Sequence, residues 1–159
     1  MRSARNEPAA PDTPQELKAR ALRTLARREH SRAELARKLA PHAASRDALE
    51  ALLDELVRRK QLCDERYAEE RAHVLSRKYG AARIRLELRA RGVAEDTVEN
   101  IATAAGTDDL ERARAILRKR YAAPPSTREE RARRMRFLQQ RGFTGEVIRA
   151  ALGRDAHED

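Results

Sequence analysis

The residue types that most often carry catalysis or hold metals are few and scattered in this sequence. Its four histidines, His30, His42, His73 and His157, include no pair four residues apart, and none has a cysteine partner at zinc-finger spacing. We therefore expect each histidine to be a surface or boundary residue rather than a metal ligand. The single cysteine, Cys63, cannot form an internal disulfide, and we expect it to be a buried or half-buried small apolar side chain rather than a nucleophile.

Acidic residues and glycines form no reactive pattern either. The pairs Asp64–Glu65 and Glu69–Glu70 are adjacent in sequence and face different directions on a helix, which favours helix caps and solvated faces over a carboxylate active site. Neither GxxxxGK followed by Ser or Thr nor GxGxxG occurs, so no phosphate-binding glycine loop is present. We expect a binding protein, not an enzyme, with no catalytic residue, no metal and no cofactor.

The most concentrated chemical groups are cationic. Arginine guanidiniums bind phosphates and carboxylates bidentately, so ordered rows of arginine suit either DNA or an acidic protein surface. The candidate surface for such a partner comprises Arg83, Arg85, Arg89, Arg91, Arg118, Lys119, Arg120, Arg133, Arg134, Arg136 and Arg141. The alternative is a set of solvated helix faces with local ion pairs, such as Glu130–Arg134.

The positive charge is unevenly distributed along the 159 residues. Lys and Arg number 35 against 26 Asp and Glu, which gives a net charge of +9. Residues 1–60 carry +5, residues 61–106 are neutral, residues 107–153 carry +6 and residues 154–159 carry −2. A protein of this charge is attracted to polyanions, which favours nucleic acid or a nucleoprotein as partner. A compositional bias towards arginine is the alternative.

Composition also limits the class of protein. No run of 18 apolar residues exists and the N-terminus lacks an apolar signal core, so we expect neither a membrane span nor export. A single cysteine suits a reducing compartment, which places the protein in the cytoplasm. Aromatic residues make up only 3% of the chain, whereas Ala, Leu, Arg and Glu are abundant, so we expect an all-α fold.

Apolar periodicity and helix-ending residues predict nine helices. Apolar residues recur three and four positions apart in each expected helix, and Ser31 followed by Glu34 forms a capping-box pattern. The predicted helices cover 15–29, 64–79, 81–91, 94–104, 108–121 and 127–141; a second helix lies between Ser31 and Pro41, a third starts near Ser45, and a short ninth holds Val147 and Leu152. Residues 1–14, with three prolines, are expected to form a flexible arm.

An internal repeat organises these helices. Leu39, Leu88 and Leu138 are spaced by 49 and 50 residues, and three further sets keep the same spacing: Ala43, Gly92 and Gly142; Leu49, Val98 and Ile148; and Leu52, Ile101 and Ala151. Chance matches among common leucines are the alternative. We expect three tandem three-helix repeats at 15–61, 62–106 and 107–153, a tail at 154–159, and an elongated, curved, solenoid-like chain. The third repeat carries an eight-residue insertion with Pro124 and Pro125.

Three stretches resemble the RecX regulatory proteins, bacterial modulators of the RecA recombinase. They are ALRTLARREHSRAELARKL (21–39), LCDERYAEERAHVLSRKYGAARIRLELRARGV (62–93) and RRMRFLQQRGFTGEVIRAAL (133–152). The second stretch is the most specific, with Asp64, Tyr67, Tyr79-Gly80 and Glu87-Leu88 in place. Ala43 departs from the glycine of the other repeats.

The resemblance implies an all-α protein that lies along the helical groove of the RecA–DNA filament. It also implies inhibition of RecA ATP hydrolysis, strand exchange and co-protease activity, which would restrain recombination and the SOS response. A ligand shifts an assembly only through different affinities for its states, so inhibition would require preference for a less active filament or obstruction of its groove.

Two other classes of function remain open, namely a stand-alone DNA-binding protein and an adaptor for another acidic partner. No base-reading module is present, and the five aromatic residues, Tyr67, Tyr79, Tyr121, Phe137 and Phe143, offer poor stacking platforms. Direct binding to single- or double-stranded DNA is therefore expected to be weak and not sequence-specific. We expect a monomer.

Overall fold

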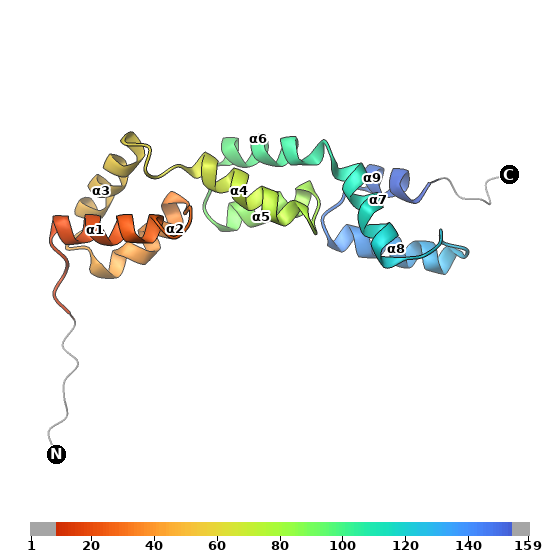
Figure 1. The fold of residues 1–159 in the computed structure, drawn as a ribbon, viewed down its shortest axis with the longest axis horizontal. Helices are drawn as coiled ribbons and strands as arrows, with labels where there is room; N and C mark the ends of the chain where they lie inside the picture. Colours follow the sequence, from red (N-terminus) through yellow and green to blue (C-terminus); the bar gives the residue numbers. More distant parts are fainter. Residues whose placement is uncertain (1–8, 154–159) are drawn as a thin grey trace, which may run out of the picture. The chain divides into compact units, whose positions relative to one another are not determined.

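The computed structural model describes residues 9–153, which form nine α-helices and one short 3₁₀ helix with no strand among them (Figure 1). The helices are α1 (Pro14–Leu25), α2 (Arg32–Leu39), η1 (Ala40–His42), α3 (Arg46–Arg58), α4 (Asp64–Ser76), α5 (Ala81–Ala90), α6 (Glu95–Gly106), α7 (Asp109–Arg120), α8 (Arg128–Gln140) and α9 (Gly145–Leu152). The all-α prediction is confirmed.

Serine and threonine side chains begin five of these helices. Each accepts a hydrogen bond from the backbone N–H three residues later, which satisfies a donor that has no partner inside the helix. The capping residues are Thr13, Ser31, Ser45, Thr127 and Thr144. At Thr13 the bond is reciprocal, because the Glu16 carboxylate also accepts from the Thr13 N–H at 2.8 Å.

Two helices end three or four residues before their predicted ends. Helix α1 ends at Leu25 rather than residue 29, because the chain turns there to bury His30 and to start α2 at the extended Ser31. Helix α4 ends at Ser76 rather than Tyr79, because the following turn brings Gly80 against the third group of helices, where its N–H donates to Arg141 O at 2.8 Å.

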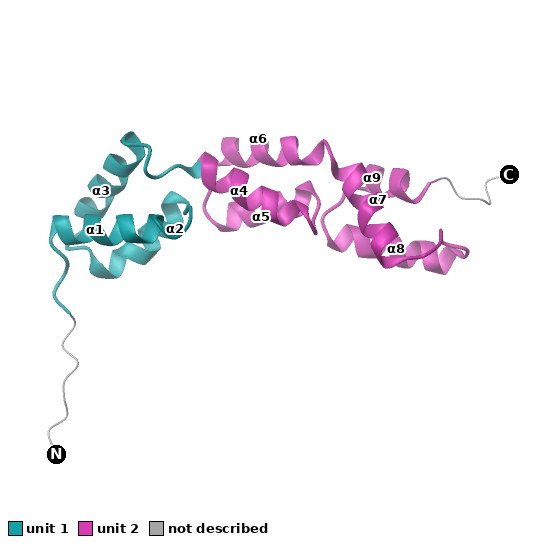
Figure 2. Cartoon of the chain, viewed as in Figure 1, with its two compact units in different colours: residues 1–64 teal, residues 65–159 magenta. Residues whose placement is uncertain are grey.

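Each consecutive group of three helices has its own apolar core. Leu39, Leu88 and Leu138, which share the repeat spacing, are at most 1% exposed at the centres of the three cores. The chain divides into two compact units, residues 1–64 and residues 65–159, and the second unit holds two of the three cores (Figure 2). The predicted repeat boundaries and the predicted elongated shape stay predictions.

In the first unit, α1 packs against α2 and α3, and ion pairs join the same helices. Lys18 Nζ lies 2.7 Å from Glu55 Oε1, linking α1 to α3. Before α1, the Asp12 N–H donates to His42 O at 2.8 Å and its carboxylate binds Arg20. Residue 12, inside the predicted arm, is therefore held against the first unit; residues 1–8 and the tail 154–159 lie outside the described residues.

In the second unit, two glycines allow the backbones of the second and third groups to meet. The Ala82 N–H donates to Gly142 O at 3.2 Å, beside the bond from Gly80 to Arg141. A Cβ added at Gly80 would lie 2.5 Å from Gly142 O, and Gly142 itself has a φ of 84°. The predicted helix ranges only left both glycines outside the helices, whereas the structure shows that they contact each other.

We expect Gly80→Ala to lower the free energy of unfolding by about 2 kcal/mol, because a methyl group there overlaps the carbonyl of Gly142 and forces the two groups apart. Chemical denaturation followed by circular dichroism measures the change. Gly145→Ala is the matched control, since a Cβ there would meet only the flexible end of Arg149 at 3.3 Å. Equal losses in the two variants would contradict the close contact.

Aspartates at the start of α4 and α7 cap helices far away in sequence. Asp64 was predicted to cap the fourth helix, but it is the first residue of α4 and its Oδ1 accepts from the Arg32 N–H at the start of α2, at 2.7 Å. Asp109, the first residue of α7, accepts in the same way from the Ala81 N–H at the start of α5, at 3.0 Å. The same capping contact thus recurs in both places.

Asp109 is 2% exposed, and its burial raises the pKa of the carboxyl above the ordinary value despite the bonds from the Ala81 N–H and Arg112. Ionisation of Asp109 therefore destabilises the fold as pH rises from the ordinary carboxyl pKa through the raised one. We expect Asp109→Ala to cost about 1–3 kcal/mol because it leaves a buried N–H unpaired, and Asp109→Asn to cost less because its amide oxygen still accepts.

Denaturation of wild type and Asp109→Asn at several pH values tests this sign. The wild type is expected to lose stability relative to Asp109→Asn as pH rises from acid to neutral. A relative gain over the same range would show that the ionised carboxylate is favoured in the fold.

Candidate functional site

The predicted arginines of α5 fall into two kinds. Three of them are engaged by carboxylates of their own group of helices, at nitrogen–oxygen distances of about 3 Å. These pairs are Arg85 with Glu99 (2.7 Å), Arg89 with Glu95 (2.9 Å) and Glu99 (3.1 Å), and Arg91 with Glu87 (3.2 Å). Their charge is largely neutralised within the fold, so they are poor candidates for an anionic partner. Arg83, on the same helix, makes no such pair.

The other predicted cations lack carboxylate partners. Among residues 9–153, no Asp or Glu lies within ion-pair distance of Arg83, Arg118, Lys119, Arg120, Arg133, Arg134, Arg136 or Arg141. The local pair Glu130–Arg134 does not form, because the Glu130 carboxylate accepts from the Ser126 N–H at 2.8 Å instead. Cations without carboxylate partners generate a positive potential that favours binding of an external anion.

Four of these arginines alternate with three aromatic rings, and we name this set the arginine–aromatic ladder. The distances from guanidinium carbon to ring centroid are 5.6 Å for Arg83–Tyr79, 6.0 Å for Arg141–Tyr79, 4.6 Å for Arg141–Phe137, 4.7 Å for Arg120–Phe137, 5.9 Å for Arg120–Tyr121 and 4.1 Å for Arg134–Tyr121. The ladder joins the turn before α5 to α8 and to the end of α7. In each of these cation–π contacts the negative face of the ring attracts the guanidinium.

Backbone carbonyls fix two of the guanidiniums in place. Arg141 Nη1 donates to Lys78 O at 3.1 Å, and Arg134 Nη1 donates to Ala123 O at 2.8 Å. Rings and carbonyls therefore hold the arginines without neutralising them, and their remaining N–H groups can bind phosphate or carboxylate oxygens. Because guanidiniums lie over the rings, the ladder does not offer these ring faces for stacking by bases.

Sequence reasoning missed the aromatic half of the ladder. Tyr79, Tyr121 and Phe137 were considered only as sparse stacking residues, and nothing in their spacing shows that they gather. Each directly follows a lysine or arginine, but so common a pattern does not indicate a contact. The other two aromatics, Tyr67 and Phe143, are core residues, each 4% exposed.

One histidine differs from its prediction. His30 is 1% exposed rather than at the surface, because the turn between α1 and α2 folds it inward, with Nδ1 3.0 Å from Arg28 O and Nε2 3.1 Å from Lys38 Nζ. Its burial lowers the pKa of the imidazole.

Cys63 is half-buried, and residues 9–153 contain no group of three or more His, Cys, Asp or Glu side chains placed to hold a metal. None of the helices in this range is long and apolar enough to span a bilayer.

Comparison with known proteins places the chain in a family. Residues 64–100 match the family model "RecX, second three-helix domain", and residues 107–152 match "RecX, third three-helix domain". The chain is 47% identical over 142 residues to Regulatory protein RecX of Leptothrix cholodnii, covering 89% of this chain and 90% of that protein. The chain belongs to the RecX family of regulatory proteins.

Other RecX proteins agree in extent and in fold. Regulatory protein RecX of Ralstonia nicotianae is 44% identical over 149 residues, covering 93% of this chain and 94% of that protein. The crystal structure of RecX from Lactobacillus salivarius superposes with a TM-score of 0.77 at 20% identity, covering 87% and 94% of the two chains. That likeness confirms the three-helix-repeat fold of the RecX chain.

Proposed function

We propose that this RecX chain regulates the RecA recombinase by binding the RecA–DNA filament in its helical groove. Membership of the RecX family supports a regulatory role directed at RecA. The structural observation that carries the proposal is that eight predicted cations in residues 65–153 have no carboxylate partner, since a filament of protein and DNA offers carboxylates and phosphates. The partner is bound by this surface, and no chemical step is performed on it.

The proposed effect is inhibition of RecA ATP hydrolysis, strand exchange and co-protease activity, which restrains recombination and the SOS response. Binding energy alone can do this when the protein binds an inactive filament state more tightly than an active one, or when it obstructs the groove. The proposed contact surface consists of the ladder arginines and four further exposed cations, Arg118, Lys119, Arg133 and Arg136. The ion-paired arginines of α5, Arg85, Arg89 and Arg91, are left out of it.

A titration of the protein into DNA-stimulated RecA tests the proposal. We expect ATP hydrolysis to fall at amounts near or below one protein per RecA subunit. An unchanged rate across the titration rejects the proposed function. We also propose that the protein is a cytoplasmic monomer. Sedimentation of the protein without RecA measures its oligomeric state.

The second candidate is a stand-alone DNA-binding protein, and a gel shift with and without RecA distinguishes it. The cations without partners favour some DNA binding, with a steep dependence on salt. The covered ring faces of the ladder argue against tight binding of single strands through base stacking. Tight binding to bare DNA together with no effect on RecA would favour this candidate.

A further inference from the structure

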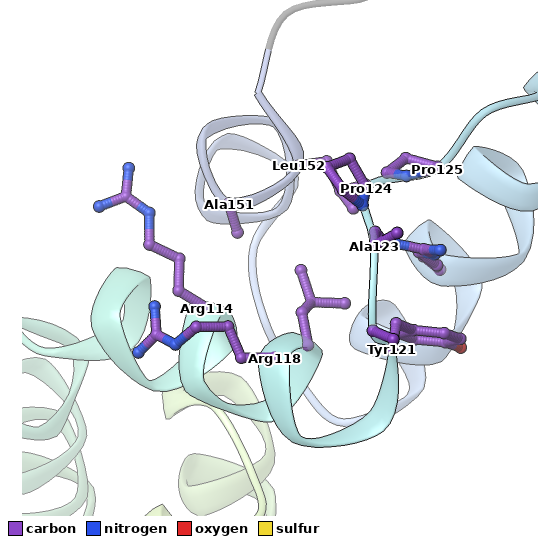
Figure 3. A pocket seen from close by; sticks show the side chains of 11 residues that line it. Arg114, Arg118, Tyr121, Ala123, Pro124, Pro125, Ala151 and Leu152 are labelled. Atoms are coloured by element: carbon purple, nitrogen blue, oxygen red, sulfur yellow. Dashed lines mark hydrogen bonds between the residues drawn. The ribbon is translucent and has the colours of Figure 1, made fainter.

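A pocket of about 320 Å³ lies between α7, the proline-containing turn after it and the end of α9 (Figure 3). Its apolar lining comes from Leu117, Pro124, Ala151 and Leu152. Arg114 and Arg118 extend from α7 on one side of it, while Leu152 and Pro124 lie on the other. The pocket is therefore apolar inside and cationic at its edge.

The arginines at the edge of the pocket differ in whether a carboxylate of the protein already binds them. Arg118 is exposed and has no carboxylate partner among the described residues, whereas Arg114 Nη1 lies 2.8 Å from Glu111 Oε1. Arg134 is fixed against Tyr121 and Ala123 O but has no carboxylate. Arg118 and Arg134 are therefore the two cations of the lining without a carboxylate partner among the described residues.

The pocket depends on the insertion that distinguishes the third repeat. Pro124 and Pro125, both in its lining, belong to the extra residues between α7 and α8. Proline fixes the backbone φ angle, so this wall of the pocket loses little conformational freedom when a ligand binds.

We propose that this pocket is the docking site for an acidic protein segment in which one large apolar side chain is flanked by carboxylates. The apolar side chain enters between Leu117 and Leu152, and the carboxylates bind Arg118 and Arg134. The inference deepens the proposed function and rests on it, because we assign the segment to the protein part of the filament.

The lining favours a protein segment over nucleic acid. A single strand binds through bases stacked on open aromatic faces. Tyr121, the aromatic residue of the lining, carries the Arg134 guanidinium 4.1 Å from its ring centroid and meets the edge-on Phe137 ring at 6.3 Å. The remaining apolar lining is aliphatic, which suits an aliphatic or aromatic side chain seeking burial.

Two labelled peptides test the pocket without RecA. The probe is fluorescein-labelled Asp-Glu-Asp-Leu-Asp-Glu-Asp, and its partner carries Ser in place of Leu, so that charge is unchanged. We expect the Leu peptide to bind about tenfold more tightly, because burial of the leucine adds to the same electrostatic attraction. Equal affinities of the two peptides would overturn the proposal, because binding would then depend on negative charge alone. Any other polyanion, such as oligothymidylate, would bind in the same way.

Variants locate the site. The pocket-filling Ala151→Phe is expected to abolish the preference for the Leu peptide, whereas Arg118→Glu is expected to weaken binding of both peptides and to weaken inhibition of RecA. Arg149→Glu is the control, since it makes the same charge change on α9 outside the lining. Retention of the preference in folded Ala151→Phe, or an equal loss of peptide binding in Arg118→Glu and Arg149→Glu, would overturn the proposal.

The two proposals fail differently. If the wild type inhibits RecA but the two peptides bind alike, the pocket proposal falls and the proposed function stands. If the peptides are distinguished but the wild type leaves RecA unaffected, the proposed function falls and with it the assignment of the segment to the filament. Peptide discrimination together with unchanged inhibition by Arg118→Glu overturns that assignment alone.

Discussion

Replacing both Arg133 and Arg136 by glutamine is expected to raise the concentration that half-inhibits RecA ATP hydrolysis by about tenfold. Both side chains are exposed on α8 and neither has a carboxylate partner among residues 9–153. Their charges are therefore fully available to the filament, and two lost contacts of ~0.7 kcal/mol each give a tenfold change. The ATPase titration measures it, with circular dichroism to show that the helices persist.

The matched control is the pair Arg85→Gln and Arg89→Gln on α5. It removes the same charge from another surface helix, but these guanidiniums already bind Glu95 and Glu99. Exposed ion pairs add little to stability, so the control protein should fold and inhibit nearly as the wild type does. If the two double variants lose inhibition equally, internal pairing does not decide which arginines contact the filament.

The largest loss of stability is expected for Leu88→Ala, at roughly 2–5 kcal/mol. Leu88 is completely buried in the core formed by α4, α5 and α6, and truncation leaves a cavity that the surrounding helices only partly fill. Chemical denaturation provides the free energy of unfolding for the variant and the wild type.

Leu86→Ala is the control for this change. Leu86 lies on the same helix, two residues earlier, and is 60% exposed, so its truncation should alter stability by less than about 0.5 kcal/mol. Similar losses in the two variants would mean that α5 does not bury the face seen in the structure.

Local rules predicted the helices well because they act over three or four residues. The starts of α2, α3 and α8 were visible as Ser31, Ser45 and Thr127 ahead of an apolar pattern, and the spacing of Leu39, Leu88 and Leu138 marked residues of three cores. The ends of α1 and α4 were predicted too late, because contacts made by His30 and Gly80 with other parts of the fold decide where those helices stop.

The candidate site was predicted only in part, because the availability of an arginine depends on distant residues. Arg85 is neutralised by Glu99, fourteen positions later, a contact outside the reach of any rule for neighbours on one helix. The ladder likewise requires the turn at Tyr79 to meet Phe137 through Arg141. The list of cations could be read from the sequence, but which of them remain unpaired could not.

The backbone bonds from Gly80 to Arg141 and from Ala82 to Gly142 make the second three-helix group depend on the third. If the third group melted, two amides at the start of α5 would lose their acceptors and exchange with solvent. The two groups should therefore unfold cooperatively, and the hydrogen-exchange rate of the Gly80 amide should report the opening of α8 and α9, although it lies in neither helix.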